Sequence, residues 1–498
     1  MIYETVIGLE VHVELSTASK IFCSCSTHFG QEPNTQCCPV CMGLPGALPV
    51  LNREVVTYAL RACLATHCTV AATTRFDRKN YFYPDLPKAY QISQLYQPIG
   101  TNGFLELPDL ARRVGIREIH MEEDAGKLIH DPWEDCTLVD YNRCGVPLLE
   151  IVSDPDLRSA EEAIAYLEKL RGILQFLHVS DVRMQEGSLR ADVNVSVRPA
   201  GSKTLGVRTE MKNMNSFKAI SRAITAESRR QIELIEEGKP IRQETRRWDE
   251  NKDASFAMRS KEDAHDYRYF PDPDLVAVQI DDSWLKSVRD SLAELPEQRQ
   301  QRYKAQFGLT GYEADLLTTD PALADLFDET ARLGGRPRDA AAWIMGEFLQ
   351  ICKEKACEAA DLNLSPAHLA TLIRLVEAGV VNRTTARQVF QAVLDDQVDP
   401  ETYIDEHGLR MLSDTDDLRR MVSEIIRDNP QSAADFHAGK TKAFGYIVGQ
   451  VMRLSRGKGD PRLINQLVNE ALAAEHAAAK NVAAEPLAVE KETKINPM

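Results

Sequence analysis

The stretch Val6-Ile-Gly-Leu-Glu-Val-His-Val-Glu-Leu15 decides how the first part of the chain folds. In it apolar residues alternate with Glu10, His12 and Glu14, which is the period-two pattern of a strand with one buried face. The same alternation recurs in residues 189–198 and 207–213. We therefore expect an antiparallel sheet with one apolar face on the core and one polar face that carries chemistry or water.

The polar face of this sheet is rich in metal-binding residue types. By alternation it carries Glu10, His12, Asp192, Asn194 and Glu210. Two further segments add acids, since residues 147–152 contain Glu150 and residues 117–127 contain Glu122 and Glu123, where the strand phase is ambiguous. A solvated outer face would explain any single strand. Carboxylates, a histidine and an amide in five segments together indicate the oxygen-rich set that Mg²⁺ requires.

A phosphate-binding P-loop does not occur in the sequence. Its Gly-Lys-Thr triplet at Gly439 has Ala434 where the first glycine of that motif should stand. If ATP binds, carboxylate-held Mg²⁺ and basic side chains must therefore hold its phosphates.

Length and composition place this sheet in a larger protein. A chain of 498 residues suggests about three domains, and 43% hydrophobic with 27% charged residues is a globular composition. After Pro296 strand alternation gives way to helical spacing, with cap-and-proline helix starts at Asp320-Pro321 and Ser365-Pro366. We expect an α+β fold: a mainly antiparallel-sheet domain at 1–293, an all-α domain at 294–407, a small helical tail domain at 408–475, and an extended or disordered segment at 476–498.

Charge is unevenly distributed along the chain. The 59 basic and 75 acidic residues give a net charge of −16, which argues against an anionic polymer as a partner of the whole molecule. Residues 395–417 hold nine acids and one base, whereas residues 439–466 hold six bases and one acid. The six bases are Lys440, Lys442, Arg453, Arg456, Lys458 and Arg462. A generic surface of an acidic protein would rarely collect them.

The eleven cysteines are bunched towards the first residues. In a reducing compartment this argues for metal ligands or buried thiols rather than disulfides. The pairs Cys23/Cys25 and Cys38/Cys41 suit a tetrahedral structural zinc site, with Cys37 as an extra or substitute ligand. Unmetallated thiols are the alternative. Four thiolates would close the coordination shell, so such a zinc ion would hold loops together and not activate water.

The apolar stretches of the chain are short. None approaches the 18 uninterrupted apolar residues of a membrane span, and the first residues do not have the pattern of a secretory signal. We expect a cytoplasmic protein without a membrane partner.

Several motifs resemble those of one known family. They are Gly8-Leu-Glu-Val-His-Val-Glu-Leu15, Cys38-Pro-Val-Cys-Met-Gly-Leu-Pro-Gly46, Lys79-Asn-Tyr-Phe-Tyr-Pro-Asp-Leu-Pro-Lys88, Glu122-Glu-Asp-Ala-Gly-Lys127, Glu186-Gly-Ser-Leu-Arg190 and Arg268-Tyr-Phe-Pro271. They are similar to the B subunits of bacterial tRNA-dependent amidotransferases, and the similarity runs to about Leu472. The resemblance implies a glutamine synthetase-like cradle for the sheet domain and a YqeY-like tail that holds tRNA.

The resemblance also implies an activity, an ATP-dependent carbon–nitrogen ligase with glutamine as nitrogen donor. Such an enzyme converts Glu-tRNA(Gln) to Gln-tRNA(Gln), or Asp-tRNA(Asn) to Asn-tRNA(Asn), in a heterotrimer with a glutaminase (amidase) A subunit and a small C subunit. A carboxylate must become an acyl phosphate before ammonia displaces its oxygen, and phosphoryl transfer relies on positioning and Mg²⁺. This chain has no Ser-Ser-Lys amidase signature, so ammonia is expected from a partner.

Individual roles follow from the same resemblance. The catalytic and Mg²⁺-binding residues would be Glu10, His12, Glu123 and Glu150, with Asp192 as a further catalytic residue. Lys79, Lys88 and Lys127 could contact the phosphates of ATP or be surface lysines. Asn194 and Glu210 line the same surface by alternation and would support the nucleotide. The basic residues of the tail would contact the misacylated tRNA.

Two other functions remain open on the sequence alone. A glutamine synthetase-like ligase acting on a free amino acid would use the same carboxylate face, but it would need neither the helical domain nor the basic tail. A non-catalytic tRNA-binding module would need the tail, but it leaves the alignment of Glu10, His12 and Asp192 unexplained.

Overall fold

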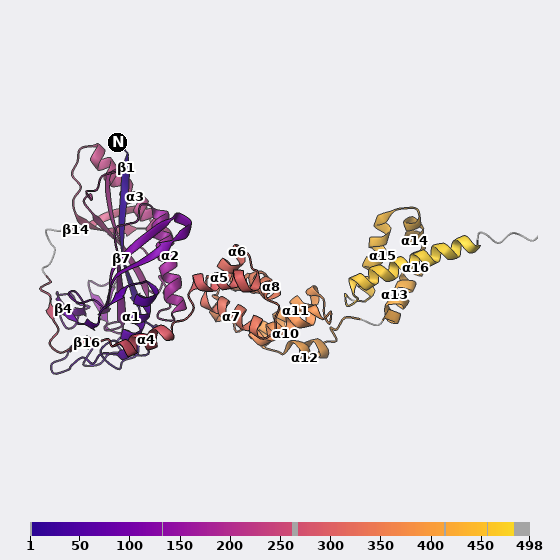
Figure 1. Ribbon diagram of the computed structural model, residues 1–498, viewed down its shortest axis with the longest axis horizontal. Helices are drawn as coiled ribbons and strands as arrows, with labels where there is room; N and C mark the ends of the chain where they lie inside the picture. Colours follow the sequence, from indigo (N-terminus) through magenta and orange to yellow (C-terminus); the bar gives the residue numbers. More distant parts are fainter. Residues whose placement is uncertain (1, 132, 261–266, 413–414, 456, 483–498) are drawn as a thin grey trace, which may run out of the picture. The chain divides into compact units, whose positions relative to one another are not determined.

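The computed structural model of the protein describes residues 2–131, 133–260, 267–412, 415–455 and 457–482. It divides into two compact units, Met1–Gln301 and Arg302–Met498. The first unit is built around a nine-stranded sheet, and the second is built from helices (Figure 1). This confirms the predicted α+β class, with the sheet in the first part of the chain and the helices after it.

The large sheet is antiparallel apart from one parallel pair, β12 with β13. Its strands, in spatial order, are β14 (Ala254–Ser260), β13 (Glu244–Asp249), β12 (Thr209–Lys212), β11 (Leu189–Pro199), β1 (Tyr3–Glu14), β10 (Pro147–Ser153), β7 (Arg112–Glu123), β6 (Gly100–Leu107) and β2 (Thr69–Val70). The segment that opens the sequence is therefore the central strand, with four strands on either side.

Strand β1 separates the two faces of the sheet as its alternation predicts. Ile7, Leu9, Val11 and Val13 are buried in the core. The helices that pack on this apolar face are α1 (Arg53–Ala65), α2 (Ala160–Phe176) and α3 (Phe217–Glu236). Ser159 and Ser216 cap α2 and α3 by accepting backbone N–H groups, as expected at helix starts. The helices cover one face and leave the other to polar residues.

Small elements carry the loops around the large sheet. A three-stranded sheet consists of β15 (Phe270–Pro271), β4 (Asp77–Asn80) and β5 (Tyr90–Ser93). A separate hairpin pairs β8 (Lys127–His130) with β9 (Thr137–Asp140). The remaining elements of this unit are β3 (Thr73–Thr74), β16 (Val278–Gln279), a 3₁₀ turn at Pro108–Leu110 and α4 (Asp282–Asp290).

The helical part contains two hydrophobic cores, one from residues 303–404 and one from residues 418–472. Its helices are α5 (Pro296–Phe307), α6 (Gly311–Leu317), α7 (Pro321–Arg332), α8 (Pro337–Trp343), a π-helical turn (Ile344–Phe348), α9 (Leu349–Lys355), a 3₁₀ turn (Ala359–Asp361), α10 (Pro366–Glu377), α11 (Arg383–Asp396), α12 (Pro400–Glu406), α13 (Thr415–Asp428), α14 (Pro430–His437), α15 (Thr441–Leu454) and α16 (Pro461–Val482). Asp320 and Ser365 cap α7 and α10 as the sequence indicates.

The domain limits differ from those expected in two places. The two compact units divide between Gln301 and Arg302, inside α5, and not at 293/294. Helix α16 continues to Val482, whereas we expected an extended or disordered segment from residue 476. The rest of that segment, 483–498, lies outside the described residues. No helix in the described ranges combines the length and the apolar character needed to span a membrane.

Candidate functional site

Cross-strand register brings ionisable side chains from five strands to the polar face of the large sheet. His12 of β1 lies opposite Arg190 of β11 and Glu150 of β10, and Glu150 in turn lies opposite His120 of β7. Two residues before His12 on β1, Glu10 lies opposite Asp192 of β11. We call this surface the acid face, and its acidic members are Glu10, Glu122, Glu150, Asp192 and Glu210.

The first group on the acid face consists of His12, Glu122 and Glu150, whose ligand atoms all lie within 4.8 Å of one another. His12 Nε2 is 3.7 Å from Glu122 Oε1 and 3.6 Å from Glu150 Oε2. His120 stands behind it, with Nε2 2.7 Å from Glu150 Oε2. The Nδ1 atom of His120 is buried, and no hydrogen-bond partner for it is found in the described part of the chain.

Electrostatics set the protonation states in this group. Burial alone would raise the pKa of Glu150, but the imidazoles of His120 and His12 hold it well below its usual range. Burial would lower the pKa of His120, but the Glu150 and Glu122 carboxylates raise it to about 9. The pKa of His12 is raised for the same reason. Two histidines thus partly neutralise the buried Glu122 carboxylate and the half-buried Glu150 carboxylate.

The second group consists of Glu10, Asp192 and Glu210, whose ligand oxygens also lie within 4.8 Å of one another. Burial and the nearby Glu150 charge raise the pKa of Glu10. Asn194 Nδ2 donates to Glu10 Oε1 at 3.0 Å, which fixes that carboxyl group. Lys212 forms ion pairs with Asp192 and, at 2.9 Å, with Glu210. Sequence reasoning singled out all of these residues except Lys212 as site residues.

The donor atoms of both groups suit a hard divalent cation. Carboxylate oxygens predominate, and Mg²⁺ is commonly held by a few carboxylates together with water and substrate phosphates. The two groups share strand β1 and are only two residues apart on it. The acid face can therefore hold cations beside one another and orient phosphates between them.

Lys79 of β4 is a half-buried cation near Glu122 of the first group. Its Nζ lies 5.0 Å from the ring centroid of Tyr267 and 5.9 Å from that of Tyr81. Burial alone would lower the pKa of Lys79, but the Glu122 charge raises it above its usual value. The ammonium group therefore remains charged, which is what a phosphate or carboxylate contact requires.

Glu123 does not join the acid face, although the resemblance placed it there. Alternation along β7 puts Glu122 on that face and turns Glu123 to the other side. There Lys88 Nζ lies 2.5 Å from both Glu123 carboxylate oxygens, and the Ile92 N–H donates to one of them at 2.9 Å. The Lys88 ammonium group is therefore paired with Glu123 rather than with a residue of the acid face. Glu122 takes the place that was assigned to Glu123.

Lys127 also lies apart from these groups. It is exposed on β8, which pairs only with β9 among the described strands.

Sequence reasoning missed His120 and Lys212. His120 and Glu122 are two residues apart on β7, a spacing that places both side chains on the same face of the sheet. Because acids also occupy positions 123 and 124, the sequence did not show which of these residues face that side.

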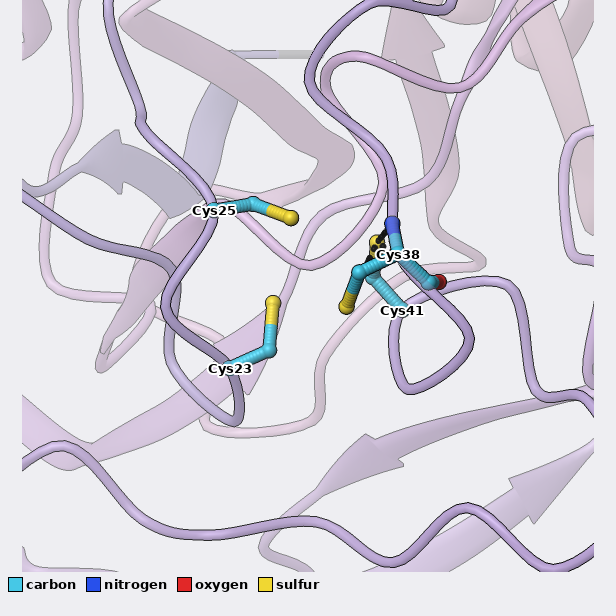
Figure 2. A group of neighbouring side chains, drawn as sticks. All are labelled: Cys23, Cys25, Cys38 and Cys41. Atoms are coloured by element: carbon cyan, nitrogen blue, oxygen red, sulfur yellow. Dashed lines mark hydrogen bonds between the residues drawn. The ribbon is translucent and has the colours of Figure 1, made fainter.

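The thiols of Cys23, Cys25, Cys38 and Cys41 point towards one another from two neighbouring loops (Figure 2). Their sulfur atoms lie within 4.8 Å of each other. The Cys38 N–H donates to Cys41 Sγ at 3.1 Å, and Lys20 Nζ lies 3.7 Å from the same sulfur. Cys37 points elsewhere, with its Sγ 3.8 Å from Asn142 Oδ1.

One of these thiols is strongly acidified. A hydrogen bond from Cys23, together with the Cys38 amide and the Lys20 charge, lowers the pKa of Cys41 to about 4 despite burial. An acidified thiol beside three further thiols suits a soft, tetrahedral cation such as Zn²⁺. Lys20 would offset part of the negative charge of such a site.

Comparison with known proteins identifies the chain's relatives. Residues 5–286 match the family described as GatB/GatE catalytic domain, and residues 325–472 match the one described as GatB domain. The B subunit of the aspartyl/glutamyl-tRNA(Asn/Gln) amidotransferase of Lachnoclostridium phytofermentans is 58% identical over 473 residues, which cover 95% of this chain and 99% of the relative. Its counterpart in Agathobacter rectalis is 53% identical over 472 residues, 94% of this chain and 99% of the relative.

The chain belongs to the amidotransferase B-subunit family. This confirms the family predicted from the motifs, and with it the main function: a subunit of a tRNA-dependent ligase that makes an amide. A ligase for a free amino acid is not favoured, because the matches include the helical part of the chain as well as the sheet. The residues of the acid face all lie within the catalytic-domain match.

The basic residues of the B-subunit tail lie around α15 within the second family match. Lys442 and Arg453 are exposed on α15 itself, and Arg462 is exposed in the first turn of α16. Two others have internal partners: Lys440 pairs with Asp435 at 2.9 Å, and Lys458 donates to the Gly408 carbonyl at 2.5 Å. Arg456 lies outside the described residues. The exposed basic residues of the tail for which the described part of the chain offers no ion pair therefore lie on one helix and at the start of the next.

The exposed side of α15 is unusually flat between its two basic residues. Gly445 and Gly449 lie in the helix interior, and a Cβ on either would meet no atom of the described residues within 4 Å. Each glycine costs about 1 kcal/mol of helix stability relative to alanine. Packing within the chain does not require them, so they leave room for an external surface between Lys442 and Arg453.

The raised pKa of His120 is open to a direct measurement. In an NMR titration its imidazole should stay protonated through pH 8, because the Glu150 carboxylate holds the proton. Glu150→Gln should lower that pKa below about 7, since burial then dominates. Glu106→Gln, an exposed change on β6, should leave it unaltered. A midpoint near the ordinary 6.5 in the unmodified protein would contradict the described hydrogen bond.

Proposed function

We propose that this chain uses ATP and Mg²⁺ in the cytoplasm to phosphorylate the side-chain carboxylate of Glu-tRNA(Gln) or Asp-tRNA(Asn), so that ammonia can replace the phosphate. The observation that carries the proposal is the pair of cation-binding groups, His12/Glu122/Glu150 and Glu10/Asp192/Glu210, side by side on one sheet face. A carboxylate resists attack by ammonia until its oxygen becomes part of a better leaving group. The acid face has the residue types that phosphoryl transfer needs.

The residues of this chain would act mainly by positioning charge. Bound Mg²⁺ would supply neutralisation of the phosphate charge. Asn194 fixes Glu10, and His120 fixes Glu150, so that two ligands on different strands are preorganised. Lys79 offers a fixed positive charge at the rim of the first group, where a phosphoryl oxygen or the acceptor carboxylate would lie.

A partner must supply ammonia in this proposal. The sequence has no amidase signature, and we assign that step to a glutaminase A subunit, with a small C subunit completing the complex. Loops of the sheet unit expose apolar side chains of the kind found at interfaces, such as Leu48, Val50 and Phe82, the last 86% exposed. These loops are where we place the partner contact.

The cation-binding role is tested by changing neighbours on one strand. In the assembled complex, Glu122→Gln should lower Glu-tRNA(Gln)-dependent ATP hydrolysis at least about 100-fold, because a charged ligand is lost. The control is Glu118→Gln, which lies on the same strand but outside both groups. Binding of the tRNA should stay within twofold in both variants.

Two results would contradict the proposal. Equal losses in the Glu122 and Glu118 variants would remove the cation-binding groups from the mechanism. Stimulation of ATP hydrolysis by free glutamate as strong as that by Glu-tRNA(Gln) would instead support a ligase for free amino acids.

We also assign a structural zinc ion to the four clustered thiols. Metal analysis of the purified protein should find about one zinc per chain, and Cys38→Ser should remove it because three thiolates bind far less tightly than four. Cys37→Ser should retain the zinc, since Cys37 Sγ faces Asn142. Loss of zinc in both variants, or in neither, would contradict the assigned ligands.

The tail is assigned to tRNA through the exposed side of α15. The double change Lys442→Glu/Arg453→Glu should weaken tRNA binding and reduce the slope of its salt dependence by about one per lost phosphate contact. Arg427→Glu, an exposed change in the last turn of α13, is the matched control and should do neither. An unchanged salt slope in the double variant would remove α15 from the tRNA interface.

A further inference from the structure

One member of the second cation-binding group lies on a short strand. Glu210 belongs to β12, which has four residues, whereas Glu10 and Asp192 lie on strands of 12 and 11 residues. A glutamate side chain is long and loses much rotamer freedom when it is fixed. Its carboxylate can therefore turn away from a site even when the backbone is held. An oxygen of Glu210 nevertheless lies within 4.8 Å of ligand oxygens of Glu10 and Asp192.

The backbone of β12 is held from the helix side of the sheet. Gln231 of α3 is fully buried, and its Nε2 donates to the Thr209 hydroxyl at 3.2 Å and to the Val195 carbonyl of β11 at 3.1 Å. These contacts tie β12 to β11 beside Glu210. They do not hold the Glu210 side chain, because successive side chains of a strand point to opposite faces.

Thr245 of β13 contacts the Glu210 side chain directly. Strand β13 runs parallel to β12, and Thr245 lies opposite Glu210 in the register. The Thr245 Oγ1 donates to Glu210 Oε2 at 2.6 Å, while Lys212 Nζ lies 2.9 Å from Glu210 Oε1. Each carboxylate oxygen thus has its own donor, which fixes the plane of the group. A carboxylate has about four acceptor positions, so a hydrogen bond does not prevent the same oxygen from binding a cation.

The two donors differ in their effect on a bound cation. Lys212 also pairs with Asp192, so its positive charge offsets part of the negative charge that attracts a cation. The Thr245 hydroxyl is neutral, and it orients Glu210 without lowering that charge. Threonine is also β-branched, which restricts its first side-chain torsion. Of the two donors, Thr245 is therefore the one that favours cation binding.

The pairing of β13 with β14 aims the Thr245 side chain. Thr245 lies opposite Arg259 and Arg246 lies opposite Ala257, so the register shifts by one residue between them. Such a bulge increases the local twist, and bulges beside active sites often re-aim a side chain. On the other face, Arg246 Nε donates to Ser255 Oγ at 2.8 Å and holds the two strands together after the shift. Backbone geometry thus places the Thr245 hydroxyl.

We propose that Thr245 is a positioning residue for the second cation-binding group. Its hydroxyl holds the Glu210 carboxylate with an oxygen towards Glu10 and Asp192, so that a divalent cation meets three oxygen ligands already in place. This inference rests on the Mg²⁺-dependent function proposed above and deepens it. Thr245 acts through Glu210, as Asn194 acts through Glu10.

A purely structural role for Thr245 predicts a different result. A hydrogen bond between β12 and β13 contributes to the stability of the fold whether or not a cation binds. Loss of that bond would then lower the thermal stability and leave the cation affinity of the folded protein unchanged. Positioning predicts instead that the cation affinity follows the hydroxyl group.

The experiment measures Mn²⁺ binding to the assembled complex from the EPR signal of free Mn²⁺. Thr245→Val replaces the hydroxyl with a methyl group and should weaken binding at one class of site about 10-fold. Thr245→Ser keeps the hydroxyl and should bind Mn²⁺ within about threefold of the unmodified complex. The matched control is Thr73→Val, since Thr73 Oγ1 donates to Gln279 Oε1 at 2.8 Å in a separate two-stranded sheet. This control should bind Mn²⁺ normally.

ATP hydrolysis separates positioning from catalysis. In Thr245→Val the Mg²⁺ concentration for half-maximal rate should rise about 10-fold, while kcat at saturating Mg²⁺ stays within about threefold. Thr245→Ala is a second variant without the hydroxyl and should behave in the same way. Thermal unfolding of each variant shows whether it is folded.

A double-mutant cycle tests the route through Glu210. In a Glu210→Gln complex, Thr245→Val should weaken Mn²⁺ binding further by less than about twofold, because the ligand that Thr245 orients is already altered.

The outcomes are separable. Unchanged Mn²⁺ affinity in the folded Val and Ala variants would overturn the inference and leave the proposed function intact. Equal weakening in Thr245→Ser would assign the effect to packing, and equal weakening with and without Glu210→Gln would show that Thr245 does not act through Glu210. Either result would overturn the inference as well. An unmodified complex that neither binds Mn²⁺ nor hydrolyses ATP would overturn the proposed function, and this inference with it.

Discussion

The acid face depends on one constraint, the alternation of β1 held in register between β10 and β11. Because successive side chains of a strand point to opposite faces, one row of β1 builds the core and the other carries Glu10 and His12. A slip of one residue against either neighbour would exchange these rows. The buried row, from Ile7 to Val13, makes such a slip costly, so the core specifies the positions of the polar side chains.

The same constraint concentrates negative charge where water is scarce. Buried carboxylates repel each other and lose hydration, and the raised pKa of Glu10 is a direct consequence. His120, His12 and Lys212 offset part of this charge within the chain. By itself, this clustering of carboxylates lowers the stability of the folded protein. Its consistent feature is a set of fixed oxygen ligands. The divalent cations that we propose would complete the charge balance that the two histidines and the lysine only begin.

Regular alternation explains which parts of this site the sequence could predict. The polar positions of β1, β11 and β12 follow an unbroken period of two, so Glu10, His12, Asp192, Asn194 and Glu210 were assigned to one face correctly. At the end of β7 the pattern fails, because consecutive acids at Glu122 and Glu123 satisfy both phases.

Two residue pairs illustrate why long-range partners cannot be predicted from sequence spacing. The pairing of Glu123 with Lys88 joins positions 35 residues apart, and that of His120 with Glu150 joins positions 30 residues apart. Each depends on the tertiary register of strands or loops. The cysteines show the opposite case, since short loop spacing was enough to group Cys23, Cys25, Cys38 and Cys41, whereas only the structure turns Cys37 towards Asn142.

The net charge of −16 was misleading for a related reason. At physiological salt, exposed charges separated by more than about 8 Å are largely screened, so the local charge around Lys442 and Arg453, and not the net charge of the whole chain, decides how α15 interacts with a phosphate. An acidic protein can therefore present a basic helix to RNA without contradiction.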